Sequence, residues 1–135
     1  MNLTELQKVD PELWREIVRG IPLQPRGQYV SFYCGQMTAH QFENCYLPLD
    51  QMMPEAAACW LQACLQRAIE VRGLVWDVSL VVDEPSPYMA GIYEIDPGYD
   101  GDCWNEQHLS CIAECGGNSP AEALLSAYLE AIHVA

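Results

Sequence analysis

The chain has 135 residues, of which 50% are hydrophobic and 19% are charged, and its formal net charge is −13 at pH 7. This length corresponds to about one domain, and the composition excludes an intrinsically disordered chain. No apolar run approaches the roughly 18 residues of a membrane span, and the N-terminal MNLTELQKVDPELW has no continuous apolar segment. We therefore expect a soluble, cytoplasmic protein with no membrane partner.

The charge is distributed unevenly along the chain. Residues 1–72 contain all six basic residues and eight acids, whereas residues 73–135 contain eleven acids and no Lys or Arg, so the two parts carry −2 and −11. Such a surface repels nucleic acid and anionic lipid, and it attracts basic partners over a Debye length of about 8 to 10 Å. We expect no direct nucleic-acid binding, and solubility is the alternative role of this charge.

Residues 1–20 are expected to be helical, in one or two pieces. Thr4 begins a capping-box pattern near the start. Asp10 followed by Pro11 is a second N-cap with proline at the first helical position, and Gly20 ends the helical part. The pattern therefore predicts a kink or a restart at Asp10.

Residues 21–53 contain three prolines and few regular patterns. A strand candidate spans residues 28–34, where residue types that suit a pleated surface are frequent. From residue 35 to residue 53 the periodicity is weak, so we expect either a long loop or a short strand near residues 45–47.

Residues 54–73, PEAAACWLQACLQRAIEVRG, are the central predicted helix. The polar residues of this helix lie on one narrow stripe with a period of 3.6 residues: Glu55, Gln62, Gln66 and Glu70. The rest of the circumference is apolar and must be covered, by a sheet on one side and by another helix or a second subunit beside it. A homodimer through helix 54–72 is one arrangement that satisfies this requirement.

The second half of the chain begins with a predicted hairpin. Residues 74–83 alternate as a strand, residues 84–87 contain two prolines and form a turn, and residues 88–95 run back as the antiparallel partner. Residues 96–105, DPGYDGDCWN, are predicted to be a loop rich in glycine and aspartate.

A third strand at residues 107–115 is expected before the last helix. Strand alternation places four of its side chains on one face: Leu109, Cys111, Ala113 and Cys115. Residues 116–118, Gly-Gly-Asn, then turn the chain. Ser119 caps the last helix, with Pro120 in its first turn and Glu122 completing the capping box.

The predicted order of elements is α-β-α-β-β-β-α, which is typical of the α+β class. We expect a single domain with an antiparallel sheet of three to four strands sandwiched between helices. Residues 1–49 are predicted to form an N-terminal extension of helix and strand, and residues 50–135 the core.

Two segments carry a family resemblance. The ending CIAECGGNSPAEALL at residues 111–125, the helix AAACWLQACLQRA at residues 56–68, and the order helix, hairpin, strand, helix are similar to the phage ABA sandwich family, over residues 50–135. The resemblance implies a phage or prophage origin and an antiparallel sheet between helical layers. It implies no catalytic residue.

No group of residues in this sequence has the types and spacing that strongly predict catalysis or metal binding. The seven cysteines lie in apolar patterns, so reduced core thiols are favoured over zinc sets drawn from Cys34, His40 and Cys45 or from Cys103, His108, Cys111 and Cys115. In a regular strand, Cys111 and Cys115 are about 13 Å apart, too far for one metal. A calcium loop at residues 96–102 is less favoured than a solvated connection. We expect no cofactor, no metal and no catalytic residue.

Aromatic residues among acids along the hairpin and its loop predict a protein-binding surface, in which carboxylates take the place of DNA phosphates. In the alternative interpretation, Trp76 and Tyr93 belong to the core and the others to a soluble rim. The expected partner-binding residues are Asp77, Asp83, Glu84, Tyr88, Glu94, Asp96, Tyr99, Asp100, Asp102 and Trp104.

The sequence therefore predicts a non-enzymatic, phage-derived accessory protein that binds and inhibits or modulates a host protein with a basic surface, such as a defence machine. Two alternatives remain open. One is a homo-oligomeric scaffold or small-molecule-binding protein, and the other is a metal-dependent or cysteine-dependent enzyme.

Overall fold

A computed structural model describes residues 2–22, 46–47, 49–96 and 108–134. The elements in this part of the chain are α1 (Leu3–Val9), α2 (Pro11–Arg19), β1 (Ile21–Pro22), β2 (Tyr46–Leu47), the 3₁₀ helix η1 (Leu49–Gln51), α4 (Pro54–Val71), β3 (Val75–Leu80), β4 (Tyr88–Ile95), β5 (Leu109–Gly117) and α5 (Pro120–Val134). The strands form an antiparallel β1-β2 pair and an antiparallel sheet in the order β3-β4-β5. The α+β class and the predicted order of elements are confirmed.

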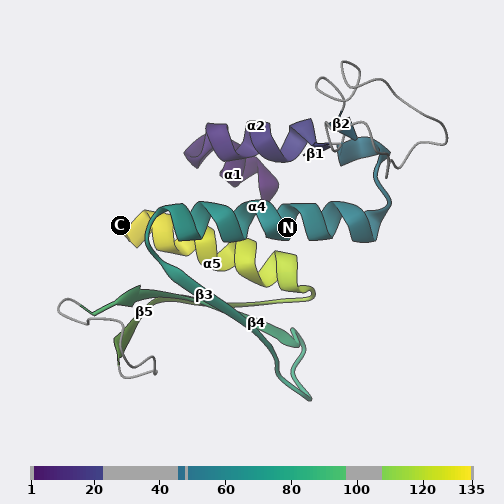
Figure 1. Ribbon diagram of the computed structural model, residues 1–135. Coiled ribbons are helices and arrows are strands. Elements are labelled where there is room, and N and C mark those ends of the chain that lie inside the picture. Colours follow the sequence, from purple (N-terminus) through teal and green to yellow (C-terminus); the bar gives the residue numbers. More distant parts are fainter. Residues whose placement is uncertain (1, 23–45, 48, 97–107, 135) are drawn as a thin grey trace, which may run out of the picture.

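The helices lie in layers on one side of the three-stranded sheet. Figure 1 shows the sheet, then α4 and α5, then α1 and α2 beyond α4. Helix α5 packs on all three strands, α4 packs on α5 and β3, and α2 packs on α4. The helical layers that we expected on both faces of the sheet therefore lie on one face among the described residues. Periodicity identifies the apolar side of each helix, but it does not identify the face of the sheet that receives it.

We call the opposite face of the sheet the outer face. The strand register and the alternation of side chains identify its residues. Its residues are Val75, Asp77, Ser79, Met89, Gly91, Tyr93, Ile95, Leu109, Cys111, Glu114 and Gly116. Several of these are polar and exposed, including Asp77, Ser79 and Glu114. Polar side chains on this face suit contact with water.

One hydrophobic core joins the layers. Leu6, Leu13 and Ile17 of the first two helices belong to the same cluster of buried residues as α4, β4 and α5. Small residues allow α5 to approach the sheet closely, because a Cβ added at Gly117 would lie 2.5 Å from the backbone nitrogen of Ala123. Gly117 is therefore required by the packing of α5 on β5.

The capping residues explain most helix boundaries. The Asp10 side chain accepts a hydrogen bond from the Leu13 amide at 3.2 Å, and α2 ends at Gly20, whose φ is 91°. Ser119 caps α5 by accepting from the Glu122 amide at 3.1 Å. The start of α1 differs from the prediction: Asn2 accepts from the Glu5 amide at 3.3 Å, so the cap lies before Thr4.

The central helix and strand β4 agree closely with the predicted boundaries, whereas β3 ends at Leu80, three residues before the predicted end at residue 83. Helix α4 ends at Val71 and is followed by Gly73 with a φ of 75°, and β4 spans the predicted residues 88–95. Strand β2 falls within the short strand expected near residues 45–47. The strand candidate at residues 28–34 lies outside the described residues. No described helix is long and apolar enough to cross a membrane.

Strand β5 differs from its prediction in two ways. It continues through Gly116 and Gly117, where we expected a turn, because these residues pair with Met89 and Tyr88. It also contains a bulge, since Ile92 pairs with Ala113 whereas Tyr93 pairs with Cys111. The extra residue between them interrupts the alternation of side chains.

The bulge changes the faces of the β5 cysteines. Cys111 lies with Tyr93 on the outer face, whereas Cys115 pairs with Ala90 on the face that α5 covers. The prediction that Cys111 and Cys115 share one face is therefore wrong. A metal site that uses both thiols is excluded by this arrangement as well as by their separation.

Candidate functional site

The centre of the outer face is a row of three residues on adjacent strands. Asp77 of β3 pairs with Gly91 of β4, which pairs with Glu114 of β5. Adjacent strands lie about 4.8 Å apart, so the Cα atoms of the two acids are about 10 Å apart. The Gly91 amide donates a hydrogen bond to Asp77 Oδ1 at 3.1 Å, which holds this carboxylate over the sheet.

The ring of Tyr93 lies over the glycine of this row. A Cβ added at Gly91 would be 2.3 Å from Tyr93 Oη and 2.7 Å from Cζ, so only glycine permits the observed position of the ring. The Tyr93 hydroxyl lies 3.3 Å from each oxygen of the Asp77 carboxylate and donates to it. Gly91 is buried on a face that no described helix covers, because the phenol shields it.

The electrostatics of the row are strongly negative. Burial is the main cause that raises the pKa of Tyr93 to about 12, followed by the charge of Asp77 and the hydrogen bond to it, with smaller effects of Cys111 and Glu114. The phenol therefore keeps its proton at neutral pH and lies near two carboxylates. Residues 73–135, which include the whole row, contain no Lys or Arg. We call Asp77, Gly91, Tyr93 and Glu114 the central row.

Of the predicted partner-binding residues, the structure places Asp77 in the central row and distributes the others. Asp83 and Glu84 are exposed in the turn between β3 and β4, and Asp83 has a φ of 68°. Glu94 and Asp96 lie at the other end of β4, where Asp96 accepts from the Ser110 hydroxyl at 2.7 Å. A strand of eight residues is roughly 25 Å long, so these acids form two separate groups.

The predicted aromatic residues are also divided. Tyr88 lies on the face that the helices cover and packs against the core, on the opposite face from the central row. Its role in partner binding stays a prediction. The remaining predicted residues lie outside the described ranges: Tyr99, Asp100, Asp102 and Trp104. The hairpin acids and aromatics therefore do not form one continuous patch in the described part.

Of the four residues of the central row, only Asp77 was among the predicted partner-binding residues. Tyr93 was one of the hairpin aromatics in the first interpretation and a core residue in the alternative, and Gly91 and Glu114 were not singled out. The spacing of Gly91 and Tyr93 was the available signal, because residues i and i+2 of a strand share a face and a glycine leaves room for a neighbouring ring. Glu114 required knowledge of the bulge in β5.

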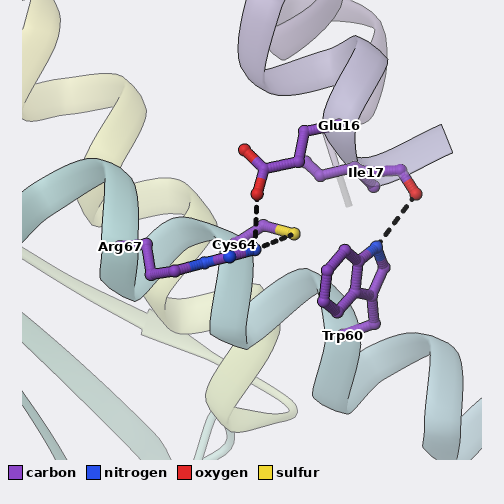
Figure 2. A network of polar contacts seen from close by, with 5 residues as sticks. All are labelled: Glu16, Ile17, Trp60, Cys64 and Arg67. Atoms are coloured by element: carbon purple, nitrogen blue, oxygen red, sulfur yellow. Dashed lines mark hydrogen bonds and ion pairs between the residues drawn. The ribbon is translucent and has the colours of Figure 1, made fainter. Parts of the chain in front are cut away.

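A second polar region lies between α2 and α4. Figure 2 shows Arg67 of α4 paired with Glu16 of α2, and the same guanidinium near Cys64 Sγ at 3.8 Å. The Trp60 indole N–H donates to the Ile17 carbonyl at 3.1 Å, and Arg67 lies 5.3 Å from the centre of the Trp60 ring. These contacts fasten the end of α2 to the middle of α4.

Two open cavities lie along this helix contact. One has a volume of about 410 Å³, and its wall includes Arg15 and Glu16 of α2 and Arg67 of α4. The other, of about 570 Å³, extends to Asp10, Arg72 and Tyr128. Both walls contain acids and bases, and Glu16 pairs with Arg67 in both.

The thiols near these regions are poor nucleophiles. Burial raises the pKa of Cys64 to about 11, and burial with a hydrogen bond to Glu130 raises the pKa of Cys115 to about 12. Both thiols are therefore protonated at neutral pH. Within the described ranges, no group of three or more His, Cys, Asp or Glu side chains is arranged to hold a metal ion.

The surroundings of α4 bear on the predicted homodimer. Leu61 is buried in the core cluster, and Trp60 packs against it and donates to Ile17 of α2. The two sides of the helix that needed cover contact α2 and α5 of the same chain. The homodimer through helix 54–72 stays a prediction, and Trp60 is engaged within the monomer.

Comparison with known proteins finds no matching family model, curated protein or solved structure. The resemblance to the phage ABA sandwich family therefore stays a prediction from the sequence.

Proposed function

We propose that this protein binds another protein through the outer face of its sheet and transforms no substrate. The observation that supports this proposal is the central row, where Asp77 and Glu114 flank the Tyr93 phenol in a part of the chain without Lys or Arg. A surface with two carboxylates and an accessible aromatic ring complements a basic protein surface.

Apolar side chains near the row extend the contact that a partner would make. Met89 is half-buried beside Gly116, and Ile95 is 39% exposed at the end of β4. Apolar area next to charged groups is typical of protein interfaces, in which burial stabilises the complex and charges select the partner.

The partner that fits this face is a host protein with a basic surface, in the cytoplasm of a bacterium. A protein that binds DNA or RNA has such a surface, and occupation of it by carboxylates would exclude the nucleic acid. Inhibition or modulation of such a host protein, in particular a defence protein, is the role that we propose. The phage origin in this proposal depends on the sequence resemblance of residues 50–135.

The test compares two charge-matched variants for affinity toward a protein captured from a bacterial lysate. Asp77→Asn with Glu114→Gln alters the outer face, and Glu12→Gln with Glu55→Gln alters exposed acids of α2 and α4. Each variant removes two negative charges. We expect the first variant to raise Kd by about tenfold, which is about 1.4 kcal/mol, and the second by less than about twofold.

Salt dependence provides the second readout of the same experiment. Because the Debye length falls from about 10 Å at 0.1 M to about 3 Å at 1 M salt, the affinity of the unaltered protein should weaken as salt rises. Equal losses in both variants, or an affinity that does not change with salt, would overturn the proposal that the outer face recognises a basic surface.

A further inference from the structure

We propose that the central row holds one arginine side chain of the partner, with the guanidinium stacked on the accessible side of the Tyr93 ring and its N–H groups donating to Asp77 and Glu114. This inference rests on the proposed function and specifies the group that the outer face recognises. The occupant is a protein side chain, and charge complementarity is the reason for choosing it.

The position of Tyr93 prepares one side of its ring for such a contact. One side lies against the backbone of Gly91, and the hydroxyl is held by the Asp77 carboxylate. The side chain as a whole is only half-buried, so the accessible part is the side that points away from the sheet. A ring that is already fixed loses little conformational freedom when a planar cation stacks on it.

The two acids define where the charge of the occupant must lie. Asp77 and Glu114 are on the two strands that flank β4, in register through Gly91, and the Tyr93 ring lies over this glycine. Both are exposed, so they are hydrated in the free protein and accessible to a partner. A guanidinium has N–H groups that point in several directions in one plane, which allows it to stack on the ring and to donate on both sides at once.

Other cations fit this site less well. A lysine ammonium is a compact, strongly hydrated charge and lacks the planar surface that stacks on a phenol. A metal ion needs several convergent oxygen, nitrogen or sulfur ligands, and no such group of three is present among the described residues. Arginine is therefore the side chain that can both stack on Tyr93 and donate to Asp77 and Glu114.

The inference is tested by NMR titration of the ¹⁵N-labelled full chain with the peptide acetyl-Gly-Arg-Gly-amide. The matched peptides contain lysine, or citrulline, which has the shape of arginine without its charge. We expect the arginine peptide to shift the amide resonances of Gly91, Tyr93 and Glu114 with a Kd on the order of 1 to 10 mM. The lysine peptide should bind at least about threefold more weakly, and citrulline should produce no saturable shift.

Variants test whether the peptide binds to the central row or is attracted by the overall negative charge of the surface. Asp77→Asn with Glu114→Gln should raise the Kd of the arginine peptide by at least about fivefold, whereas Glu84→Gln with Glu94→Gln, which removes the same charge from the two hairpin ends, should leave it within about twofold. Tyr93→Phe retains the ring and should keep most of the binding, whereas Tyr93→Leu should lose it. Thermal melts of both Tyr93 variants establish that they are folded.

The outcomes distinguish this inference from the proposed function. Equal binding of arginine and lysine peptides, saturable binding of citrulline, or shifts confined to Glu84 and Glu94 would overturn the arginine site, while salt-dependent binding of a basic partner would still support the proposed function. If the arginine peptide binds the row but the captured partner binds equally well to the Asp77→Asn, Glu114→Gln variant, the proposed function fails instead.

Discussion

The α2–α4 contact and the outer face of the sheet use charged residues in opposite ways. Between the helices, Arg67 pairs with Glu16 and stacks near Trp60, so the charges serve the internal packing of the chain. On the outer face, the Asp77 carboxylate receives hydrogen bonds from a backbone amide and a phenol, which leave its negative charge in place. Arg67 therefore serves to join two helices of the same chain, whereas the hydrogen bonds of Asp77 supply no positive charge. In our proposal, a partner supplies that charge.

Two of the glycines of the sheet, Gly117 on the covered face and Gly91 on the outer face, provide the strongest test of this difference. At Gly117, an added methyl group meets the backbone nitrogen of Ala123 at 2.5 Å, and the backbone of α5 cannot move aside without disturbing the core. We expect Gly117→Ala to lower the free energy of unfolding by about 3 kcal/mol. For a domain of this size, that corresponds to a decrease in Tm of roughly 10 °C, measurable by thermal denaturation.

The control for Gly117→Ala is Ala90→Gly, on the same covered face of the adjacent strand β4. Ala90 is buried, and its methyl group already fits the packing. This substitution removes a buried methyl without a clash and should cost less than Gly117→Ala. If Gly117→Ala leaves Tm unchanged, the close packing of α5 on β5 is wrong.

Tyr128→Phe probes the packing of α2 against the other helices. The Tyr128 side chain is 1% exposed, and its hydroxyl donates to Asp10 Oδ2 at 2.6 Å. Removing this hydrogen bond to a carboxylate should lower the free energy of unfolding by about 2 kcal/mol at pH 8. The ring remains, so the contact with Arg72 at 5.7 Å is kept and only the hydroxyl is tested.

The pH dependence of the same variant has a definite sign. Burial, with the hydrogen bond to Asp10, raises the pKa of Tyr128 from 10.0 to about 12. A raised pKa in the folded state contributes stability that is complete below pH 10 and is lost as the pH rises toward 12. The difference between the unaltered protein and Tyr128→Phe in urea denaturation should therefore be largest at pH 8 and smaller at pH 11. A difference that grows with pH would contradict the role of the protonated hydroxyl.

Much of the fold follows from short-range signals in the sequence. Asp10, Ser119 and the flanking prolines predicted where α2 and α5 begin, and apolar periodicity predicted α4. These signals act over three or four residues, where a side chain either satisfies a backbone N–H or does not. Alternation over residues 88–95 also predicted β4.

The features that the sequence did not predict depend on how the strands pair with one another. The bulge in β5 arises from its pairing with β4, and it moved Cys111 to the outer face while Cys115 stayed under α5. The predicted binding residues are close in sequence, yet an extended strand places Glu84 and Glu94 at opposite ends of the hairpin. Only Asp77 of those residues lies in the central row, because the row is built from three strands.

Gly91→Ala is the outer-face counterpart of Gly117→Ala. Here the added methyl group meets the Tyr93 hydroxyl and ring and the Asp77 carboxylate, which are ends of side chains that can rotate away into solvent. We expect a loss of only about 1 kcal/mol in the free energy of unfolding. The displaced phenol loses burial and its contact with Asp77, so the pKa of Tyr93 should fall from about 12 toward its ordinary value of 10.0.

Ultraviolet titration of Tyr93 measures that pKa, with Tyr93→Phe as the reference from which the signal of this tyrosine is obtained. The arginine peptide should also bind more weakly to Gly91→Ala, because the ring no longer lies between the acids. An unchanged pKa would show that the ring does not depend on the glycine beneath it.

The smallest expected effect belongs to the ion pair between the helices. The side chains of Arg67 and Glu16 are 54% and 42% exposed, so solvent screens their attraction, and Arg67→Gln should lower the free energy of unfolding by about 0.5 kcal/mol. A double-mutant cycle with Glu16→Gln isolates this coupling, which should diminish at 1 M salt. Neither Arg67→Gln nor Glu16→Gln should alter arginine-peptide binding at the central row. Asp77→Asn should show the opposite pattern and weaken that binding. It should leave the free energy of unfolding within about 0.5 kcal/mol, because the amide oxygen of asparagine still accepts from the Gly91 amide. A loss of peptide binding in Arg67→Gln would mean that the two regions are coupled, and the separation of internal and partner-directed charges would then be wrong.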